Sequence, residues 1–358
     1  MRKQILTAVL LAGCSAGTAG TAAIAADGAP STTIGGRTFI DFTNISQQSN
    51  GVDTSASGTG LDVKRAYFIV DHTFDGIWSA DLTTDFRYTS GDTDLYVKKA
   101  YIQARINDAL VVRAGAEDTP WVPFVENLYG YRYIENTLID RLKYGTSSDW
   151  GLSASGKLDG GLFQYSLSAL NGAGYKTPTR SKTVDFEGRI GVVPLAGLTL
   201  AAGFYDGHRG QETAANPAEN TATRWDAAVD YHHGLLNVGA EYFDARKWNQ
   251  VQLTAPQPAD QAQGESVWAS VDMTAQWAVF ARYDTAKPSR TLAAALKDEY
   301  FNVGVAFRPR KGLDLALVYK NERVDDGSIS TSNGTVGGVN ALTGGRYGEV
   351  GIWSQLSF

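Results

Sequence analysis

Apolar and polar residues alternate along much of the chain, with a period of two residues. Near the C-terminus, Val350, Ile352, Leu356 and Phe358 share one face of such a segment, and Ser354 is the one polar residue on that face. The same alternation recurs in residues 224–232, 266–273, 301–308 and 313–320. Because successive side chains of a β-strand point to opposite sides, the pattern predicts an all-β chain whose strands have one apolar and one polar face.

Short turn sequences alternate with long polar segments along the chain. Pairs such as Asp75-Gly76 and Asp159-Gly160 supply the positive φ angles of tight hairpins. Long polar segments lie between them, at residues 46–60, 118–148, 172–182, 207–222, 246–263, 287–296 and 324–343. We therefore expect about sixteen antiparallel strands with short periplasmic turns and long extracellular loops, as in a transmembrane β-barrel. The alternative, a soluble β-sandwich, has no reason to sort its connections by length.

Charged residues on the polar faces favour a water-filled interior. Arg224, Asp226 and Asp230 fall on one face of a predicted strand. Burying such groups without water or partners costs several kcal/mol each. A barrel of about sixteen strands leaves an aqueous channel, whereas about eight strands are filled by side chains. The sequence therefore predicts a solvated bore.

The first residues read as a targeting segment. Arg2 and Lys3 precede a short apolar run and then small residues up to Ala26, which is typical of a secretory signal peptide. We expect a signal peptide at residues 1–26 and a transmembrane β-barrel domain at residues 27–358. Cys14, the single cysteine, also fits a lipoprotein signal, so it is either a lipidation site or removed with the signal peptide. In the second case the mature chain has no disulfide.

Composition argues against several classes of function. The net charge is −6, and no basic tail or patch indicates nucleic-acid binding. No segment after residue 26 provides the about 18 apolar residues of a membrane helix. The chain has four histidines, and none accompanies a nucleophile motif or a paired acid. We expect no enzyme activity, no cofactor and no metal site.

Candidate channel residues gather in the first half of the chain and in its longest loop. On a consistent alternation, several cations point inward from successive strands, and we call them the basic wall: Arg37, Arg65, Arg87, Lys99, Arg105 and Arg113. The segment 118–148 follows, and loops of that length are usually functional. It carries acids and interspersed cations at Glu126, Arg132, Glu135, Asp140 and Arg141.

Several short motifs resemble those of bacterial porins. Lys64-Arg65-Ala66, residues 97–101, Pro120-Trp121 and Leu170-Asn171-Gly172 are similar to the phosphate-selective porin O and P family. The terminal strand ending in Phe358 resembles the insertion signal of outer-membrane barrels. The long loop opposite an arginine ladder resembles the inward-folded constriction loop of general trimeric porins.

This resemblance implies an all-β, sixteen-stranded homotrimeric channel in the Gram-negative outer membrane. The implied partners are outer-membrane lipids and lipopolysaccharide, the barrel-assembly machinery through Phe358, and small solutes in transit. Phosphate specificity is not carried over, because the chain is acidic overall and Asp81 and Asp85 share the face of Arg87.

The main functional prediction is a channel for passive diffusion of small hydrophilic solutes and ions. An arginine wall facing an acidic loop would set ion preference through its field, and the bore diameter would set the size limit. Two alternatives stay open: a porin selective for phosphate, other anions or carbohydrate, and a structural or adhesive barrel without an open pore. Tyr129, Tyr131 and Tyr133 could form a sugar-binding track or pack the loop against the wall.

Overall fold

The computed structural model describes residues 29–89, 92–252, 257–338 and 343–358. The predicted signal peptide and Cys14 lie outside the described residues. Sixteen of the strands in these ranges form one closed antiparallel barrel. They are β1 (Ser31–Ser49), β3 (Gly58–Thr73), β4 (Trp78–Thr89), β5 (Asp92–Asn107), β6 (Leu110–Asp118), β7 (Ser148–Leu158), β8 (Phe163–Leu170), β9 (Asp185–Leu195), β10 (Leu198–Gly207), β11 (Ala222–His233), β12 (Leu236–Arg246), β13 (Gln261–Asp272), β14 (Trp277–Lys287), β15 (Lys297–Arg310), β16 (Leu313–Asp325) and β19 (Gly345–Ser357).

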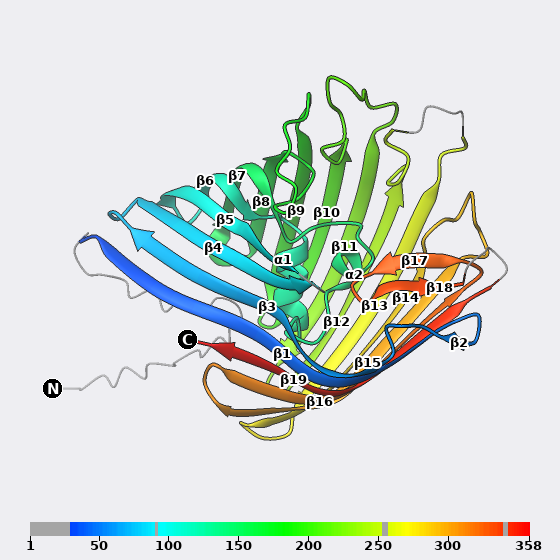
Figure 1. The fold of residues 1–358 in the computed structure, drawn as a ribbon. Coiled ribbons are helices and arrows are strands. Elements are labelled where there is room, and N and C mark those ends of the chain that lie inside the picture. Colours follow the sequence, from blue (N-terminus) through cyan, green and yellow to red (C-terminus); the bar gives the residue numbers. More distant parts are fainter. Residues whose placement is uncertain (1–28, 90–91, 253–256, 339–342) are drawn as a thin grey trace.

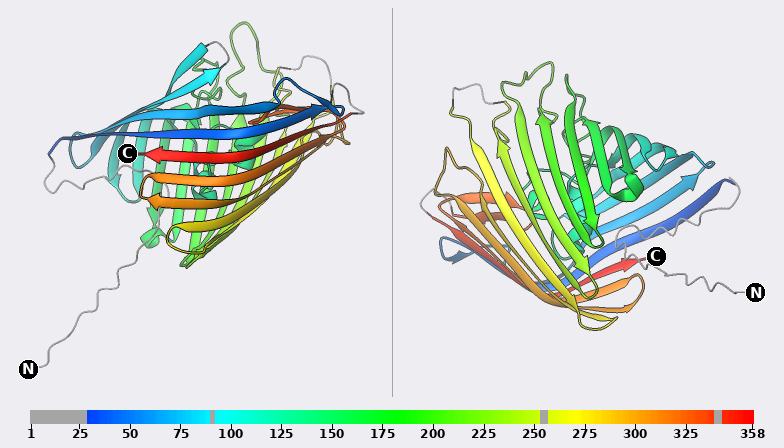
Figure 2. Two further views of the ribbon diagram at one scale, coloured as in Figure 1. Left: turned by 60° about the horizontal axis from the view of Figure 1, so that its bottom comes forward. Right: turned by 180° about the vertical axis from the view of Figure 1, so that it is seen from behind.

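The barrel closes because β1 pairs with both β3 and β19. Figure 2 shows the first and last strands side by side, in blue and red. The pairing with β19 runs from Arg37 opposite Ser357 to Ser49 opposite Gly345. Every strand therefore has two neighbours, and no long edge is left open to pair with another chain. The predicted fold class, a barrel of about sixteen antiparallel strands, is confirmed.

The two faces of the strands differ as the alternation predicts. On β15, Phe301, Val303 and Val305 face outward and are 37%, 48% and 41% exposed. Tyr300 and Asn302, between them, face the interior and are buried. Apolar side chains exposed around the whole outside of a molecule indicate contact with lipid. The barrel is thus built for a membrane.

The closing strand ends against a glycine. The Phe358 backbone exchanges two hydrogen bonds with Gly36, each of 3.1 Å. A Cβ atom at Gly36 would lie 2.5 Å from the Phe358 ring. A side chain at this position of β1 would collide with the terminal ring, so glycine is what allows the two strands to close here.

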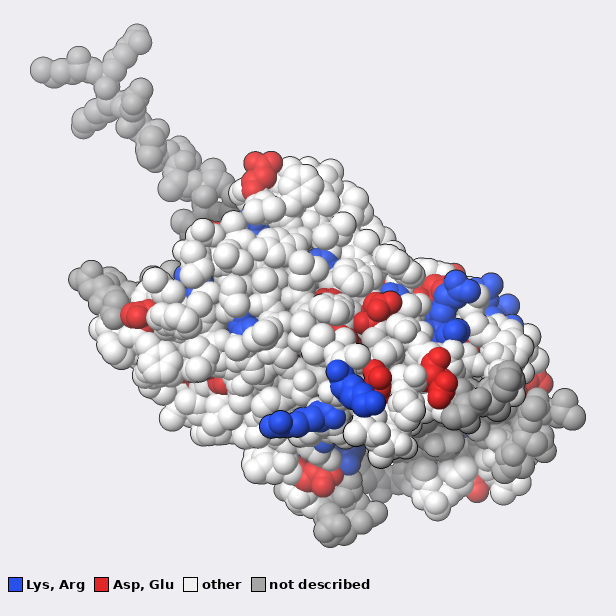
Figure 3. Space-filling view, turned by 90° about the horizontal axis from the view of Figure 1, so that it is seen from above, with Lys and Arg blue, Asp and Glu red and all other residues white. Residues whose placement is uncertain are grey.

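The connections sort by length, as predicted. At one end the strands are joined by short turns, such as residues 108–109, 196–197, 234–235 and 311–312. At the other end most connections are long, and Figure 1 shows them rising above the barrel. Seen from above the view of Figure 1, charged residues of both signs are scattered among mostly uncharged ones (Figure 3).

A few shorter elements accompany the sixteen long barrel strands. The connection between β6 and β7 contains two short helices, α1 (Val122–Tyr129) and α2 (Leu138–Arg141), which lie inside the barrel (Figure 1). The hairpin of β17 (Ser328–Thr331) and β18 (Gly334–Gly337) belongs to the last long connection. The remaining elements are β2 (Val52–Asp53), which pairs with β1, and a 3₁₀ turn, η1 (Asp159–Gly161). None of the helices in the described ranges is long and apolar enough to span a membrane.

Candidate functional site

The inner loop, residues 119–147, enters the barrel and packs against one side of it. Helix α1 contacts β12, and α2 contacts β13. Pro123 stands in the first turn of α1, where its missing amide hydrogen costs nothing. The helix ends at Gly130, whose φ of 79° is the left-handed conformation that favours glycine. Trp121, just before α1, is fully buried and donates its indole hydrogen to Glu241, at 2.8 Å.

Arg141 anchors the far end of the loop. Its guanidinium donates to Asp284 at 3.0 Å, to Glu322 at 2.8 Å and to Asp298 at 2.5 Å. All four side chains are 0% exposed. Arg282 also donates to Asp284, at 2.7 Å. Charged hydrogen bonds of this kind are stronger than neutral ones, and here they join the loop to β14, β15 and β16.

A second anchor lies at Arg224, on β11. Its guanidinium donates to Asp226 at 2.8 Å, to Glu187 at 3.1 Å and to the backbone oxygen of Tyr144 in the loop. Arg224 and Asp226 are on the face where the sequence predicts solvated charges. The loop covers them, so these charges are satisfied by protein partners instead of water.

The three tyrosines of the loop are buried in this contact. Tyr131 stacks on Phe280 with ring centroids 4.2 Å apart, and Tyr129 meets Trp268 at 6.1 Å. Tyr129, Tyr131 and Tyr133 are only 2%, 4% and 6% exposed. Burial raises the pKa of the Tyr129 phenol to about 12. Of the two interpretations, packing against the wall fits this geometry, and a sugar track does not.

The β17–β18 hairpin covers the loop from the extracellular side. The backbone amide of Ser332 donates to the oxygen of Arg141 at 3.0 Å, and its hydroxyl donates to Glu135 at 2.5 Å. Burial raises the pKa of Glu135, but Lys320, 3.5 Å away, and the Ser332 hydroxyl outweigh it and lower the pKa to about 2. The carboxylate is therefore charged at neutral pH. The sequence interpretation includes no role for this hairpin.

Most cations of the basic wall are paired with acids beside them. Arg65 bonds Asp85 at 2.9 Å on the next strand, and Arg87 bonds Asp94 at the same distance. Lys99 and Arg113 pair with acids near the end of β6, Asp118 at 2.6 Å and Glu117 at 3.7 Å.

The two remaining members of the basic wall lie apart. Arg105 pairs with Asp108 at 3.0 Å on a short turn, at the periplasmic end, and its side chain is 59% exposed. Arg37, on β1, has no ion pair among the described residues, and its Nε atom is buried without a hydrogen-bond partner there. The structure therefore brings Arg65, Arg87, Lys99 and Arg113 onto adjacent strands and leaves Arg105 at the rim.

Most of the loop charges predicted to face the basic wall are also paired with other residues. Arg132 pairs within the loop, with Glu126 at 2.5 Å and with Asp140 at 3.7 Å. Glu135 and Arg141 point to the opposite side of the barrel. Only Arg132, Glu126 and Asp140, whose side chains are 15–18% exposed, lie toward the basic wall.

Two β-bulges add lumen cations that strict alternation assigns to the lipid side. Lys64 is the extra residue where Arg65 and Val63 face Phe39 and Ile40, and its ammonium lies 3.3 Å from Asp41. Lys98 is the extra residue between Lys99 and Val97 on β5. In each case a bulge turns two consecutive cations toward the interior. Adjacent cations in one strand, Lys64-Arg65 and Lys98-Lys99, were the signal that could have found them.

Lys98 and Lys176 form a small group with three tyrosines. The Lys98 ammonium lies 4.9 Å from the Tyr67 ring centre, and Lys176 lies 5.5 Å from those of Tyr96 and Tyr175. Neither lysine pairs with a carboxylate in the described ranges, so their charges are held only by aromatic faces. Burial lowers the pKa of Lys176 to about 8, and repulsion by Arg65 adds to this.

The two sides of the interior thus differ in exposure. We call β11–β16 the covered wall, and β1 with β3–β6 the open wall. On the covered wall the side chains of Arg224 and Arg282 are 0% and 1% exposed, and the side chain of Arg141, which the inner loop docks against this wall, is 0% exposed. On the open wall the side chains of Arg65, Arg87 and Arg113 are 19%, 41% and 30% exposed. Solvent inside the barrel therefore reaches the open wall.

Comparison with known proteins places the fold. No protein-family model matches the sequence, and no curated protein matches it. Solved structures do match. The anion-selective porin from Comamonas acidovorans has a TM-score of 0.68 at 12% identity, over 92% of this chain and 100% of that one. The outer-membrane channel DcaP of Acinetobacter baumannii has a TM-score of 0.65 at 13% identity, over 92% and 98%.

A third match is OmpT of Vibrio cholerae in its trimer form, with a TM-score of 0.61 at 12% identity, over 92% of this chain and 100% of that one. The chain has the outer-membrane porin fold. The exposed apolar outer faces described above suit contact with lipid, as in transmembrane barrels of this fold. These three structures are of an outer-membrane channel, a porin and an outer-membrane protein.

Proposed function

We propose that the chain forms a water-filled channel through which small hydrophilic solutes and ions diffuse passively across the outer membrane. The observation that carries this proposal is the difference in exposure between the walls. The inner loop packs on the covered wall, whereas Arg65, Arg87 and Arg113 on the open wall keep contact with solvent. A bore plugged throughout would bury the cations of both walls equally.

We infer a weak preference for anions. The paired cations of the basic wall are largely neutralised by the acids beside them, whereas Lys98, Lys176 and Arg37 have no acid partner in the described part of the chain. Unpaired cations along a narrow bore attract anions. Asp71 and Asp81, opposite one another on β3 and β4 nearer the periplasmic end, limit the effect. The field between the basic wall and the acids of the inner loop contributes less to this preference, because Glu126 and Asp140 are already paired with Arg132.

Recording in planar bilayers tests both points. Purified protein is inserted between chambers of unequal KCl concentration. We expect stable stepwise conductance and a reversal potential whose sign shows that chloride passes more readily than potassium. A folded barrel that inserts without conducting would support the structural or adhesive alternative. A size limit independent of solute chemistry, measured by liposome swelling, separates general diffusion from selective transport of phosphate or sugars.

We also propose the partners that the porin resemblance implies. A homotrimer is supported by the likeness in fold to the trimer form of OmpT from Vibrio cholerae. Recognition of Phe358 by the barrel-assembly machinery is supported by the exposed terminal ring, 72% exposed. Lipopolysaccharide is the outer-leaflet partner. Native mass spectrometry of the detergent-solubilised protein measures the number of chains in the assembly directly. A single mass corresponding to one chain would argue against the homotrimer.

A further inference from the structure

The segment that follows β8, residues 171–177, lies against the open wall, and we call it the strap. Its backbone amides at Asn171 and Tyr175 donate to backbone oxygens of β7, those of Trp150 at 2.8 Å and Ser148 at 3.0 Å. The Tyr175 hydroxyl reaches Asp85 of β4, at 2.6 Å. Strands β5 and β6 lie between β4 and β7 in the sheet. The strap therefore crosses in front of β5 and β6 on the lumen side.

Two glycines allow the strap to take this path. Gly172 and Gly174 have φ angles of 90° and 76°, a conformation that favours glycine. Their amides both donate to one oxygen of Asp149 on β7, at 2.9 and 3.1 Å. A Cβ atom at Gly172 would collide with a carboxylate oxygen of Asp185. The strap is therefore held to β7 by a single carboxylate.

Tyr175 anchors the other end of the strap. Its side chain is only 6% exposed. The oxygen of Asp85 that accepts from its hydroxyl also accepts from Arg65, at 2.9 Å. The side chain of Asp85 is 0% exposed, and hydrogen bonds to a charged acceptor are stronger than neutral ones. Asp85 thus offsets the charge of Arg65 and fixes Tyr175 at the same time.

The ring of Tyr175 lies beside two lysines that have no acid partner in the described part of the chain. The ammonium groups of Lys176 and Lys98 lie 5.5 and 5.9 Å from its centre. The ring of Tyr96 meets that of Tyr175 edge-on at 6.3 Å and gives Lys176 a second aromatic contact, at 5.5 Å. Attraction between a cation and an aromatic ring depends on where the ring is held. The strap itself contains no Asp or Glu, so it brings a cation into the lumen without an acid.

We propose that Tyr175 is a positioning residue for ion selectivity: by bonding Asp85, it holds the strap so that Lys176 and Lys98 face passing anions. The inference rests on the proposed channel with its preference for anions. It adds that this preference depends on the docking of the strap as well as on the number of charges in the lumen. Tyr175 contributes no charge of its own.

Tyr175→Phe tests the proposal without changing any charge. We expect the ratio of chloride to potassium permeability, measured from reversal potentials in unequal KCl, to fall about twofold or more, because Lys176 leaves the bore. The matched control is Tyr165→Phe, which removes a tyrosine hydroxyl that donates to Ala109 at 2.8 Å on the outward side of β8. That control should keep the parent ratio. An unchanged ratio in Tyr175→Phe overturns the proposal.

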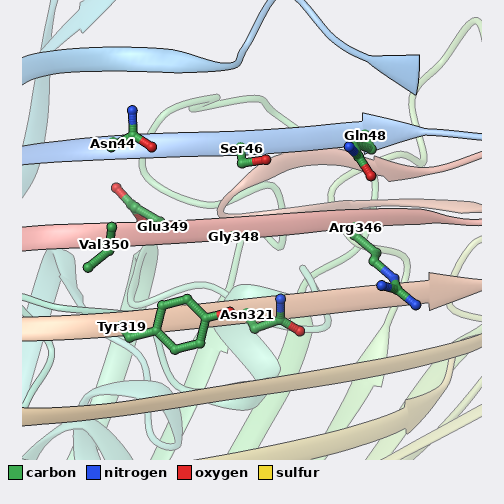
Figure 4. Close-up of a pocket in the computed structure, with 9 residues that line it drawn as sticks. All are labelled: Asn44, Ser46, Gln48, Tyr319, Asn321, Arg346, Gly348, Glu349 and Val350. Carbon is green, nitrogen blue, oxygen red and sulfur yellow. The ribbon is translucent and has the colours of Figure 1, made fainter. Parts of the chain in front are cut away.

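Asp149→Asn distinguishes positioning from simple charge. Removing a negative charge from the lumen should by itself increase the preference for anions. If the strap is released from β7 and takes Lys176 with it, the preference falls instead. An increase in this variant contradicts the proposal. A cation outside the bore supplies the charge control: Arg346 lines a hollow of about 240 Å³ on the outer wall, and Arg346→Gln should leave the ratio unchanged (Figure 4).

A second measurement follows Lys176 directly and does not require conductance. The rate at which a small amine reagent labels Lys176 is measured against pH by mass spectrometry of its peptide. In the parent, burial and repulsion by Arg65 and Arg87 outweigh attraction by Asp85 and Asp140 and lower the pKa of Lys176 to about 8. In Tyr175→Phe the ammonium gains solvent, so the midpoint should rise toward the ordinary lysine value of about 10.4.

The two measurements separate the failure of this inference from that of the proposed channel. A shift in selectivity with an unchanged Lys176 midpoint overturns the inference, because the effect then does not run through this lysine. A shifted midpoint with unchanged selectivity also overturns it. A parent barrel that inserts without conducting refutes the proposed channel, whereas a midpoint that rises in Tyr175→Phe still supports the positioning of Lys176 by the strap.

Discussion

The covered wall and the open wall are made of the same residue types and differ in what those residues face. At the covered wall, Arg224 of β11 and Arg141 of the docked inner loop are enclosed by carboxylates, backbone oxygens and aromatic rings, with no exposed surface. Arg87 and Arg113 make single ion pairs with neighbours and remain 41% and 30% exposed. Arginine in the lumen therefore serves two roles, fixing the loop on one side and lining the water on the other.

The difference arises from where the inner loop packs. Ion pairs between half-exposed side chains contribute at most about 1 kcal/mol. A buried charge that loses its partner costs about 3–5 kcal/mol. The covered wall should therefore respond to substitution with a loss of structure, and the open wall with a change in ion selectivity.

The largest expected effect is at Arg141. Arg141→Met leaves Asp284, Asp298 and Glu322 without the guanidinium that they share, and should destabilise loop docking by about 3–5 kcal/mol. Protease cleavage between residues 119 and 147 and the noise of the open channel both measure this. Arg87→Met, on the open wall, is the matched comparison and should leave the loop protected. A loop equally resistant in both variants would show that the two walls do not differ in this way.

The second-largest expected effect is a change in ion selectivity when an unpaired cation of the open wall is replaced. Lys98→Gln removes a cation that has no acid partner, so the reversal potential in unequal KCl should move toward cation selectivity. Lys99→Gln/Asp118→Asn removes a whole ion pair, bonded at 2.6 Å, and keeps the lumen charge constant. That double variant should leave the reversal potential near the parent value. Equal shifts in the two variants would remove Lys98 from the selective region.

The smallest effect depends on pH. Burial, with repulsion by Arg65, lowers the pKa of Lys176 to about 8. Its ammonium is charged below that pH and neutral above it, so the preference for anions should decline as pH rises from about 7 to 9. Lys176→Arg, which stays charged across this range, should abolish the decline. A slope that persists in this variant would assign the titration to another group.

The fold could be predicted because period-two alternation and connection length are local properties. Phe301, Val303 and Val305 show their outward face in the sequence, and turn pairs such as Asp159-Gly160 mark where hairpins end. The number of strands and their closure follow from those signals. Nothing comparable marks the terminal contact of Phe358 with Gly36, which joins residues at opposite ends of the chain.

The site could be predicted only in part, because it depends on contacts between distant segments. The basic wall lies on the predicted lumen face, but the acids that hold it, such as Asp85 and Asp94, are its own neighbours. The partners of Arg141 come from residues more than a hundred positions away, so no local pattern identifies them. The β17–β18 hairpin is a Ser/Gly-rich segment whose position over the loop appears only in three dimensions.

The bulges at Lys64 and Lys98 have a consequence for how such a bore can change over evolutionary time. Ordinarily, deleting one residue from a strand shifts its register and turns every following side chain to the wrong side. A bulged residue is already unpaired with the neighbouring strand, so losing it leaves the flanking positions where they were. Insertions and deletions at Lys64 and Lys98 can therefore add or remove a single positive charge, and the other side chains of the strand keep their inward or outward orientation.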